Sequence, residues 1–204
     1  MQQLSLKHRL NNGDSVYGIF NSIPDPLMIE VIAASGYDFV VIDTEHVAIN
    51  DETLAHLIRA AEAAHIIPIV SVTEVIDRDI IKVFDMGASG IIVPHVKVSE
   101  TVEHIVKLSR YGLDMIVEGA ADLSQSLGIP WQTRDDQVTS HVQHMFEVVN
   151  AHGKHFCALP REDEDIAKWQ AQGVQTFILG DDRGKIYRHL SASLATSKQK
   201  GDEG

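Results

Sequence analysis

The sequence predicts an α/β protein built on a parallel β-sheet, because strand-like and helix-like segments alternate along the chain. Short apolar runs rich in Val, Ile and Phe are separated by longer amphipathic segments. The short runs lack a strict polar alternation, which is typical of strands buried on both faces. Alternating strands and helices with short links favour right-handed βαβ units and therefore parallel strands. We expect a (β/α) barrel of the TIM type.

The apolar runs predict seven strands, and turn signals separate them from the helices. Asn50 or Asp51 and Ser99 are suited to cap helix starts. Glycines stand where helix ends favour a left-handed residue, at Gly36, Gly87, Gly112, Gly153 and Gly173. The expected strands are Val16–Phe20, Asp38–Asp43, Ile66–Val72, Gly90–Pro94, Leu113–Val117, Lys154–Leu159 and Val174–Gly180. The expected helices are Pro26–Ser35, Asp51–His65, Asp77–Met86, Ser99–Tyr111, Asp136–His152, Glu162–Gln172 and Arg183–Thr196.

Seven βα units are one fewer than a closed barrel of this class contains. Three explanations stay open: an undetected strand, an open sheet, or a barrel that is one unit short. A dinucleotide-binding fold is disfavoured, because no G-x-G-x-x-G motif follows the first strand. We expect one barrel domain over residues 1–196 and a flexible polar tail over residues 197–204.

Composition and charge exclude several classes of function. The formal net charge is -12 and no basic run is present, so a phosphate backbone would be repelled and nucleic acid is not expected as a partner. No apolar stretch reaches the roughly 20 residues that a membrane span needs. Residues Met1–Leu10 lack a signal-peptide core, and a lone Cys157 suits a reducing compartment, so we expect a cytoplasmic protein. The apolar neighbours of Cys157 predict a buried side chain rather than a nucleophile.

Candidate catalytic residues follow the second strand, in the segment Asp43-Thr44-Glu45-His46. In parallel α/β folds the chemistry gathers at the carboxyl ends of the strands. A histidine titrates near neutrality, and an adjacent carboxylate can support it as a general base. A polar loop with a capping Asp is the alternative interpretation.

A second candidate segment, Glu118-Gly119-Ala120-Ala121-Asp122, follows the fifth strand. Gly and Ala allow a ligand to approach the backbone, and Asp122 could bind a hard cation such as Mg²⁺. Alternatively, Asp122 is the N-cap of a helix over Leu123–Leu127. After the last strand, the paired acids Asp181 and Asp182 are expected to cap a helix.

The remaining histidines give weaker signals. His95 follows the fourth strand and is either a pocket residue or an ordinary loop residue. His141 and His144 lie three residues apart on one predicted helix, which indicates a solvated face rather than a zinc site.

These segments together resemble the HpcH/HpaI class II aldolase family. The resemblance rests on D-x-E-H at Asp43–His46 and on G-x-x-D-L-x-x-S-L-G at residues 119–128. It extends through Gly36–His46, Phe84–Ala88 and Gly90–Pro94. It implies a (β/α)₈ barrel, homo-oligomers with exchanged helices, and a divalent metal, Mg²⁺ by preference, that holds a 2-oxoacid.

The same resemblance implies roles for individual residues. His46 would be the general base, and Asp85 the acid that raises its basicity. Asp122 would be a metal ligand, and Ala121, beside Gly119, would contact the substrate through its backbone. Asp43 either takes part in catalysis or organises the loop that carries His46. Glu45 matches the motif without an assigned role.

Two departures from the family pattern weaken the implied chemistry. Ser71 occupies the position of an Arg that binds the oxoacid, and losing such a donor typically costs about 3 kcal/mol of transition-state stabilisation. Between Gly112 and Leu113 the chain lacks a loop, a strand ending in a metal-binding Glu, and a helix. Mg²⁺ held by one carboxylate would bind weakly, although Glu118 could substitute for the lost ligand. The smooth join suggests the hypothesis of a chain edited at element boundaries.

The resemblance therefore implies a carbon–carbon bond-forming enzyme acting on 2-oxoacids. The expected activity is that of a citrate synthase of siderophore biosynthesis, joining oxaloacetate and acetyl-CoA, impaired in this chain. One alternative is an aldolase that cleaves 4-hydroxy-2-oxoacids to pyruvate and an aldehyde. Another is an engineered or non-catalytic scaffold that retains the barrel and little activity.

Overall fold

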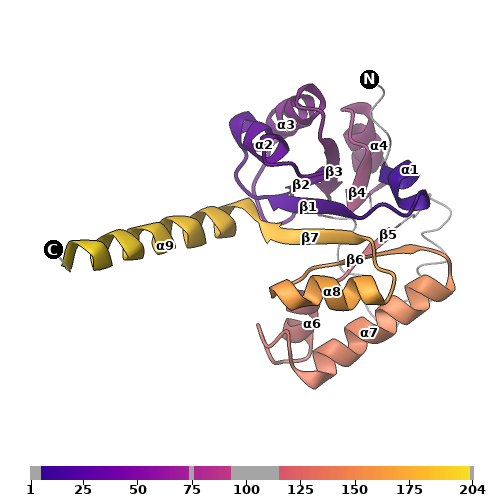
Figure 1. Ribbon diagram of the computed structural model, residues 1–204. Helices are drawn as coiled ribbons and strands as arrows, with labels where there is room; N and C mark the ends of the chain where they lie inside the picture. Colours follow the sequence, from indigo (N-terminus) through magenta and orange to yellow (C-terminus); the bar gives the residue numbers. More distant parts are fainter. Residues whose placement is uncertain (1–5, 74–75, 93–114, 203–204) are drawn as a thin grey trace. The chain divides into compact units, whose positions relative to one another are not determined.

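The computed structural model describes residues 6–73, 76–92 and 115–202, and its strands confirm the predicted parallel sheet (Figure 1). Seven strands lie in the described residues, in the order β4-β3-β2-β1-β7-β6-β5. They are β1 (Val16–Asn21), β2 (Phe39–Asp43), β3 (Ile67–Ser71), β4 (Gly90–Ile92), β5 (Met115–Val117), β6 (His155–Ala158) and β7 (Thr176–Asp181). Each matches a predicted strand, and the fold is an α/β barrel of the TIM type.

The helices confirm six of the seven predicted ones, and the seventh, Ser99–Tyr111, lies outside the described residues. The predicted helices are found as α2 (Pro26–Ala34), α3 (Asp51–Ala63), α4 (Asp77–Asp85), α7 (Asp136–Ala151), α8 (Asp163–Ala171) and α9 (Asp182–Asp202). The structure adds α1 (Leu6–Asn11), and it places α6 at Ala120–Ser126, where the alternative interpretation of Asp122 had a helix over Leu123–Leu127. Helix α9 runs six residues beyond the predicted end at Thr196.

The predicted cap at Asn50 and four of the predicted glycine helix stops are confirmed. The side chain of Asn50 accepts a hydrogen bond from the Thr53 amide and caps α3. Left-handed glycines follow four helices, at Gly36, Gly87, Gly153 and Gly173. Such a residue is favoured there because it has no Cβ to clash with the preceding carbonyl. Gly112 and Ser99 lie outside the described residues.

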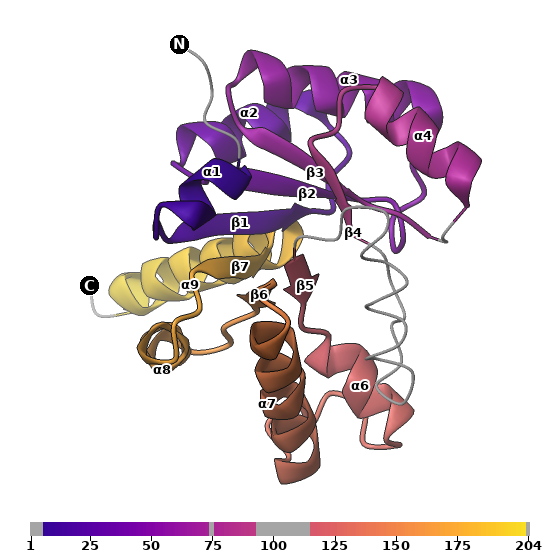
Figure 2. The same cartoon turned by 90° about the vertical axis from the view of Figure 1, so that its right-hand side faces the viewer.

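The chain divides into two compact units, one of residues 1–17 and 92–178 and the other of residues 18–91 and 179–204. In the second unit, β1 pairs in parallel with β2, and β2 with β3. Every residue of β2 and β3 is buried, as the continuous apolar runs predicted. Helices α2 and α3 pack beside each other along these strands (Figure 2).

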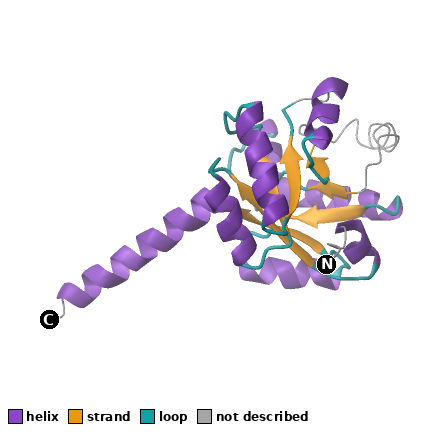
Figure 3. Ribbon diagram, turned by 90° about the horizontal axis from the view of Figure 1, so that it is seen from above, coloured by secondary structure: helices purple, strands orange, loops and turns teal. Residues whose placement is uncertain are grey.

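Close packing in this unit depends on Gly18 in β1. A Cβ at Gly18 would lie 2.1 Å from the ring of Phe39, which is fully buried. The ring therefore occupies the space that any other residue at position 18 would need. Helix α9 has no comparable packing: it extends away from the strands of its own unit, and its side chains from Lys185 to Gln199 are exposed (Figure 3).

In the first unit, β5 pairs in parallel with β6, and β6 with β7. The rings of Phe146, Phe156 and Trp169 lie 5.2–5.6 Å apart between α7, β6 and α8. Such contacts between offset and edge-on rings stabilise a core beyond simple burial. The Tyr17 ring stacks on Phe177 of β7 at 5.5 Å. These contacts hold β6 and β7 in place, and β6 pairs with β5, the strand that Glu118 and Asp122 follow.

Candidate functional site

His46 lies just after β2 and contacts the buried carboxylate of Asp43. The His46 Nδ1 atom lies 3.3 Å from Oδ2 and 3.4 Å from Oδ1 of Asp43. The Asp43 side chain is 9% exposed, whereas the His46 side chain is 65% exposed. A buried carboxylate beside Nδ1 favours the tautomer that carries its proton there, which leaves Nε2 free to accept a proton.

Asp43 also shapes the loop that carries His46. Its Oδ1 atom accepts hydrogen bonds of 3.0 Å from the backbone amides of both Glu45 and His46. The same carboxylate therefore turns the backbone and contacts the ring. Of the two interpretations left open by the sequence, the geometry gives Asp43 the loop-organising contacts and adds direct contact with His46.

Ser71 and Glu45 lie beside this pair. Ser71 ends β3 in register with Asp43, and its hydroxyl donates to Glu45 Oε2 at 3.4 Å. Glu45 Oε1 lies 3.9 Å from Nε2 of His46. The Ser71 side chain is buried and neutral, so it supplies no fixed positive charge at the position where the family pattern has Arg.

Asp85, the expected partner of His46, is placed elsewhere in the same unit. It is the last residue of α4 and its side chain is exposed. Between the described residues, the structure records no hydrogen bond or ion pair that joins Asp85 to His46. The carboxylate in contact with the His46 ring is that of Asp43, so a role for Asp85 stays a prediction.

In the other unit, Asp122 lies in the first turn of α6. The N-cap of this helix is Gly119, so the interpretation of Asp122 as the N-cap is wrong. Asp122 is exposed, and its Oδ2 atom lies 3.5 Å from the position that a Cβ at Gly119 would take. The carbonyl of Ala121 accepts a hydrogen bond of 2.6 Å from the buried Ser124. Gly119, Ala121 and Asp122 thus lie together at the carboxyl end of β5.

Glu118 is held by four donors and is unavailable as a second metal ligand. Its Oε1 atom accepts from the Leu159 amide at 2.9 Å and from Arg161 Nη1 at 3.0 Å. Its Oε2 atom accepts from the Ala120 amide at 3.3 Å and from Arg161 Nη2 at 3.4 Å. The Glu118 side chain is 2% exposed. The suggestion that Glu118 replaces the lost metal-binding Glu is therefore wrong for this geometry.

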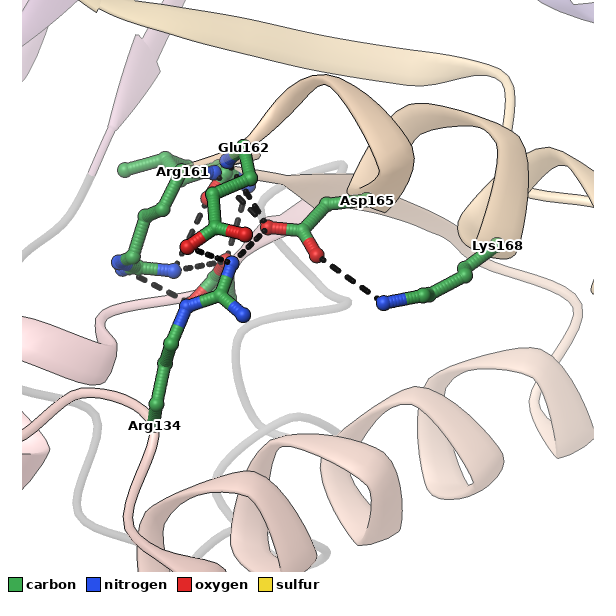
Figure 4. Close-up of polar contacts among 7 residues, drawn as sticks. Arg134, Arg161, Glu162, Asp165 and Lys168 are labelled. Carbon is green, nitrogen blue, oxygen red and sulfur yellow. Dashed lines mark hydrogen bonds and ion pairs between the residues drawn. The ribbon is translucent and has the colours of Figure 1, made fainter.

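Asp165 lies close to Arg161, the partner of Glu118, and is surrounded by the charged residues Arg134, Glu162 and Lys168 (Figure 4). Its Oδ2 atom accepts from Arg134 Nη2 and from the backbone amides of Arg161 and Glu162, each at 3.1 Å. Burial, the largest single influence, would raise the pKa of this carboxyl. The two amides and the charges of Arg134 and Lys168 outweigh burial and hold the pKa below its usual value.

The described residues provide only an incomplete set of ligands for a divalent metal. Among them, no group of three or more His, Cys, Asp or Glu side chains could hold a metal ion. Asp122 is the exposed carboxylate at the carboxyl end of β5, and Glu118 beside it is already occupied. Mg²⁺ at Asp122 would depend on water and substrate oxygens for its remaining ligands.

Asp182 is a buried polar residue whose main role the sequence did not reveal. Asp181 caps α9 as predicted, accepting from the Gly184 amide at 2.7 Å. Asp182 is 1% exposed and accepts from Asn21 Nδ2 at 2.7 Å, and from the amides of Ser22 and Ile23 at 2.9 and 3.2 Å. Its carboxylate therefore fixes the loop after β1. The partners lie about 160 positions away in sequence, so no local pattern signals this contact.

The other predicted features carry no chemistry in the described residues. The His141 ring contacts the Gln137 carbonyl on its own helix at 2.6 Å, and His144 on the same helix is exposed. His95 lies outside the described residues.

A cavity of about 230 Å³ lies at the amino ends of β6 and β7, lined by Phe146, His155 and Thr176 among others. Within this unit, that is the opposite end of the strands from Asp122. No helix in the part described is long and apolar enough to cross a membrane.

Comparison with known proteins assigns the chain to a class of enzymes. Residues 16–112 match the HpcH/HpaI aldolase/citrate lyase family. The crystal structure of the citrate synthase SbnG is 79% identical, covering 98% of this chain and 100% of that one, with a TM-score of 0.91. The chain therefore belongs to the HpcH/HpaI aldolase/citrate lyase family, as the sequence motifs predicted.

More distant relatives share the fold. An HpcH/HpaI aldolase from Desulfitobacterium hafniense is 22% identical, covering 96% of this chain and 97% of that one, with a TM-score of 0.84. The 5-keto-4-deoxy-D-glucarate aldolase of Shigella dysenteriae serotype 1 is 22% identical, covering 90% of this chain and 92% of the relative.

The lengths of these matches support the missing βα unit. The Shigella alignment extends over 236 residues but uses 90% of 204 residues, about 184, so about 52 aligned positions have no residue in this chain. This number is enough for one βα unit, since a βαβ motif takes about 30 or more residues. The family match ends at residue 112, beside the expected gap after Gly112. The strand order likewise ends at β4 and β5, between which the missing strand would stand.

Cys157 should be chemically inert in the folded protein. The side chain is fully buried, as predicted, and burial, then the negative charge of Glu118, raises the pKa of its thiol. Because the unfolded thiol ionises more easily, the free energy of unfolding should fall as the pH rises past the ordinary thiol pKa. We expect slow labelling by a thiol reagent at pH 8 and fast labelling in denaturant. Cys157→Ala should remove the alkaline loss of stability; fast labelling of the native protein would contradict the burial.

Proposed function

We propose that the chain is a carbon–carbon bond-forming enzyme on 2-oxoacids, a citrate synthase that joins oxaloacetate and acetyl-CoA for siderophore biosynthesis. The observation that carries the proposal is His46 at the carboxyl end of β2, with its ring against buried Asp43. The 79% identity to a citrate synthase over nearly the whole of both chains supports this choice of reaction. We also propose a cytoplasmic location, which fits a free, buried Cys157.

His46 acts as the general base in this proposal. Neutral His46 accepts, at Nε2, a proton from the carbon next to the thioester carbonyl of acetyl-CoA. The electron pair left on that carbon forms the new bond to the keto carbon of oxaloacetate. The charge of Asp43 stabilises the imidazolium, which then returns its proton to the oxygen of the former keto group. Hydrolysis of the thioester completes the release of citrate.

Mg²⁺ bound at Asp122 would hold the carboxylate and keto oxygens of the oxoacid and withdraw electron density from the keto carbon. With Ser71 in place of Arg and one protein carboxylate in place of two, we expect weak metal binding and impaired turnover. Asp122, Gly119 and Ala121 are the residues that we assign to this end of the substrate.

The proposal is tested by titrating Mg²⁺ and oxaloacetate into the purified chain by calorimetry, with citrate formation from acetyl-CoA assayed alongside. We expect oxaloacetate to bind in the presence of Mg²⁺ and citrate to form slowly. His46→Gln should lower turnover by about 100-fold or more, because a general base typically contributes that much. The same variant should bind Mg²⁺ and oxaloacetate nearly unchanged. A folded chain that binds no oxaloacetate would refute the proposal.

An aldolase reaction is the second candidate, supported by the relatives that are named aldolases. The same base would serve it, since cleavage of a 4-hydroxy-2-oxoacid begins with removal of the 4-hydroxyl proton. The products separate the two reactions in the same assay. Citrate from acetyl-CoA indicates the synthase, whereas pyruvate and an aldehyde indicate the aldolase.

A scaffold that keeps the fold without the activity is the third candidate, favoured by the neutral Ser71 beside His46 and Glu45. Ser71→Arg tests it by restoring a positive charge at the end of β3. We expect turnover to rise by about 10-fold or more, because one charge-assisted donor is worth several kcal/mol in a transition state. An unchanged rate in a folded Ser71→Arg protein with excess Mg²⁺ would favour the scaffold.

We further propose that the chain forms a homo-oligomer through α9. Apolar side chains of this helix are exposed: Ile186 by 37%, Leu190 by 62% and Leu194 by 58%. These three positions recur every four residues and so share one helix face. A helix that extends from its own unit with an apolar face uncovered fits burial against a second copy.

Light scattering after gel filtration tests this assembly. Leu190→Lys with Leu194→Lys should convert the oligomer to monomers, because two charges would be buried in an apolar contact. Ser191→Lys together with Ala195→Lys places the same charges one residue further along the helix and should leave the oligomer intact. A monomeric parent chain would contradict the proposal.

A further inference from the structure

The ion pair of Arg161 and Glu118 lies at the carboxyl ends of β5 and β6 and takes no part in the chemistry described so far. Arg161 belongs to the loop between β6 and α8, and Glu118 directly follows β5. Glu118 opens the candidate segment after β5, whereas Arg161 belongs to none of the family motifs or expected site residues. Any part that this ion pair takes in substrate binding rests on the function proposed above.

The geometry fixes the Arg161 guanidinium in one orientation. Its Nη1 atom donates to Glu118 Oε1 at 3.0 Å and to the Leu159 carbonyl at 2.9 Å, and Nη2 donates to Glu118 Oε2 at 3.4 Å. A planar guanidinium held along one edge by two acceptors cannot rotate freely. Its opposite edge still carries N–H groups with no recorded partner in the described residues.

The Arg161 cation can still bind an anion, because other groups also stabilise the Glu118 carboxylate. The Glu118 carboxylate also receives the amides of Leu159 and Ala120, so Arg161 is not its sole source of stabilisation. The Arg161 side chain is 30% exposed, compared with 50% for Arg134 and 67% for Lys168 in the neighbouring network. Among these three cations it is the least hydrated, and a partly desolvated donor binds an anion more strongly.

Arg161 is connected to the helix that carries Asp122 through Glu118. Glu118 Oε2 accepts from the Ala120 amide, and Ala120 begins the helix that carries Asp122 in its first turn. Asp122 Oδ2 in turn lies 3.5 Å from the Cβ position of Gly119. All of these residues belong to one compact unit. A fixed cation and the proposed oxoacid-binding carboxylate therefore follow the carboxyl ends of two paired strands, β6 and β5.

We propose that Arg161 binds the second carboxylate of a dicarboxylic 2-oxoacid and so makes the chain select diacids over monoacids. One end of the oxoacid lies at Asp122, and its distal carboxylate accepts hydrogen bonds from the free edge of the Arg161 guanidinium. Glu118 is a positioning residue that holds this edge outward. A monoacid such as pyruvate lacks the distal carboxylate and makes no contact with Arg161.

The test compares the affinities of oxaloacetate and pyruvate in the presence of excess Mg²⁺, measured by calorimetry on the full chain and its Arg161→Gln variant. We expect Arg161→Gln to weaken oxaloacetate by roughly 10-fold or more, the usual effect of losing a hydrogen bond to a charged group, and to leave pyruvate unchanged. Arg134→Gln is the matched control, since it removes a cation from the same network and should change neither affinity.

Arg161→Lys guards against a misfolded Gln variant, because it keeps the charge and loses the rigid fork. It should lower the ratio of oxaloacetate to pyruvate affinity by a smaller factor. Thermal unfolding verifies that each variant is folded. Equal weakening of both acids, or no change in either, in a folded Arg161→Gln protein overturns the selectivity proposal and leaves the proposed function standing. A parent chain that binds neither acid overturns the proposed function and the selectivity together.

Discussion

Strands buried on both faces confine polar side chains to the strand ends, and this constraint shapes each candidate site of the chain. All five residues of β2 are buried, and so are all five of β3. Asp43 and Ser71 are the last residues of these strands and face the same end, because parallel strands in register finish together. The same rule places Glu118 directly after β5, and Asp182 directly after β7. Side chains with a chemical role and side chains that fix the loops therefore occupy the same few positions at the strand ends.

The buried carboxylates at these strand ends are each stabilised by several hydrogen-bond donors. A charge removed from water is costly unless several donors replace the lost hydration. Asp43 receives two backbone amides, Glu118 two amides and one guanidinium, and Asp182 the side chain of Asn21 and nearby amides. In each case the donors come from a loop that would otherwise be poorly fixed. The hydrogen bonds that offset the cost of burying each carboxylate also order the loop. At Asp43 and Glu118 that loop carries a group suited to catalysis or binding, namely His46 and Arg161.

The sequence predicted the strands well, and the residues at their ends only in part. Continuous apolar runs located β1 to β7 because burial on both faces leaves a local signature, and Asn50 marked the start of α3 through its cap. The family motifs predicted His46 and Asp122 as site residues, and their roles stay predictions. The partners of Glu118 and Asp182 were not predicted, since Arg161 lies 43 positions from Glu118, and Ser22 lies 160 positions from Asp182. Such pairs depend on the strand order, which no local pattern encodes.

The strand order also explains why losing one βα unit need not destroy the remaining structure. Each strand of a parallel sheet bonds to its two neighbours, so removal of a unit between β4 and β5 leaves the pairs β1–β2–β3 and β5–β6–β7 intact. The losses fall on what the missing strand shared, namely a ladder on each side and a metal-binding carboxylate at its end. His46 with Asp43 and Asp122 with Arg161 each lie within a single compact unit. The polar contacts at these strand ends, Asp43 with His46 and Glu118 with Arg161, are each contained in one unit, so they do not depend on the strand that is missing.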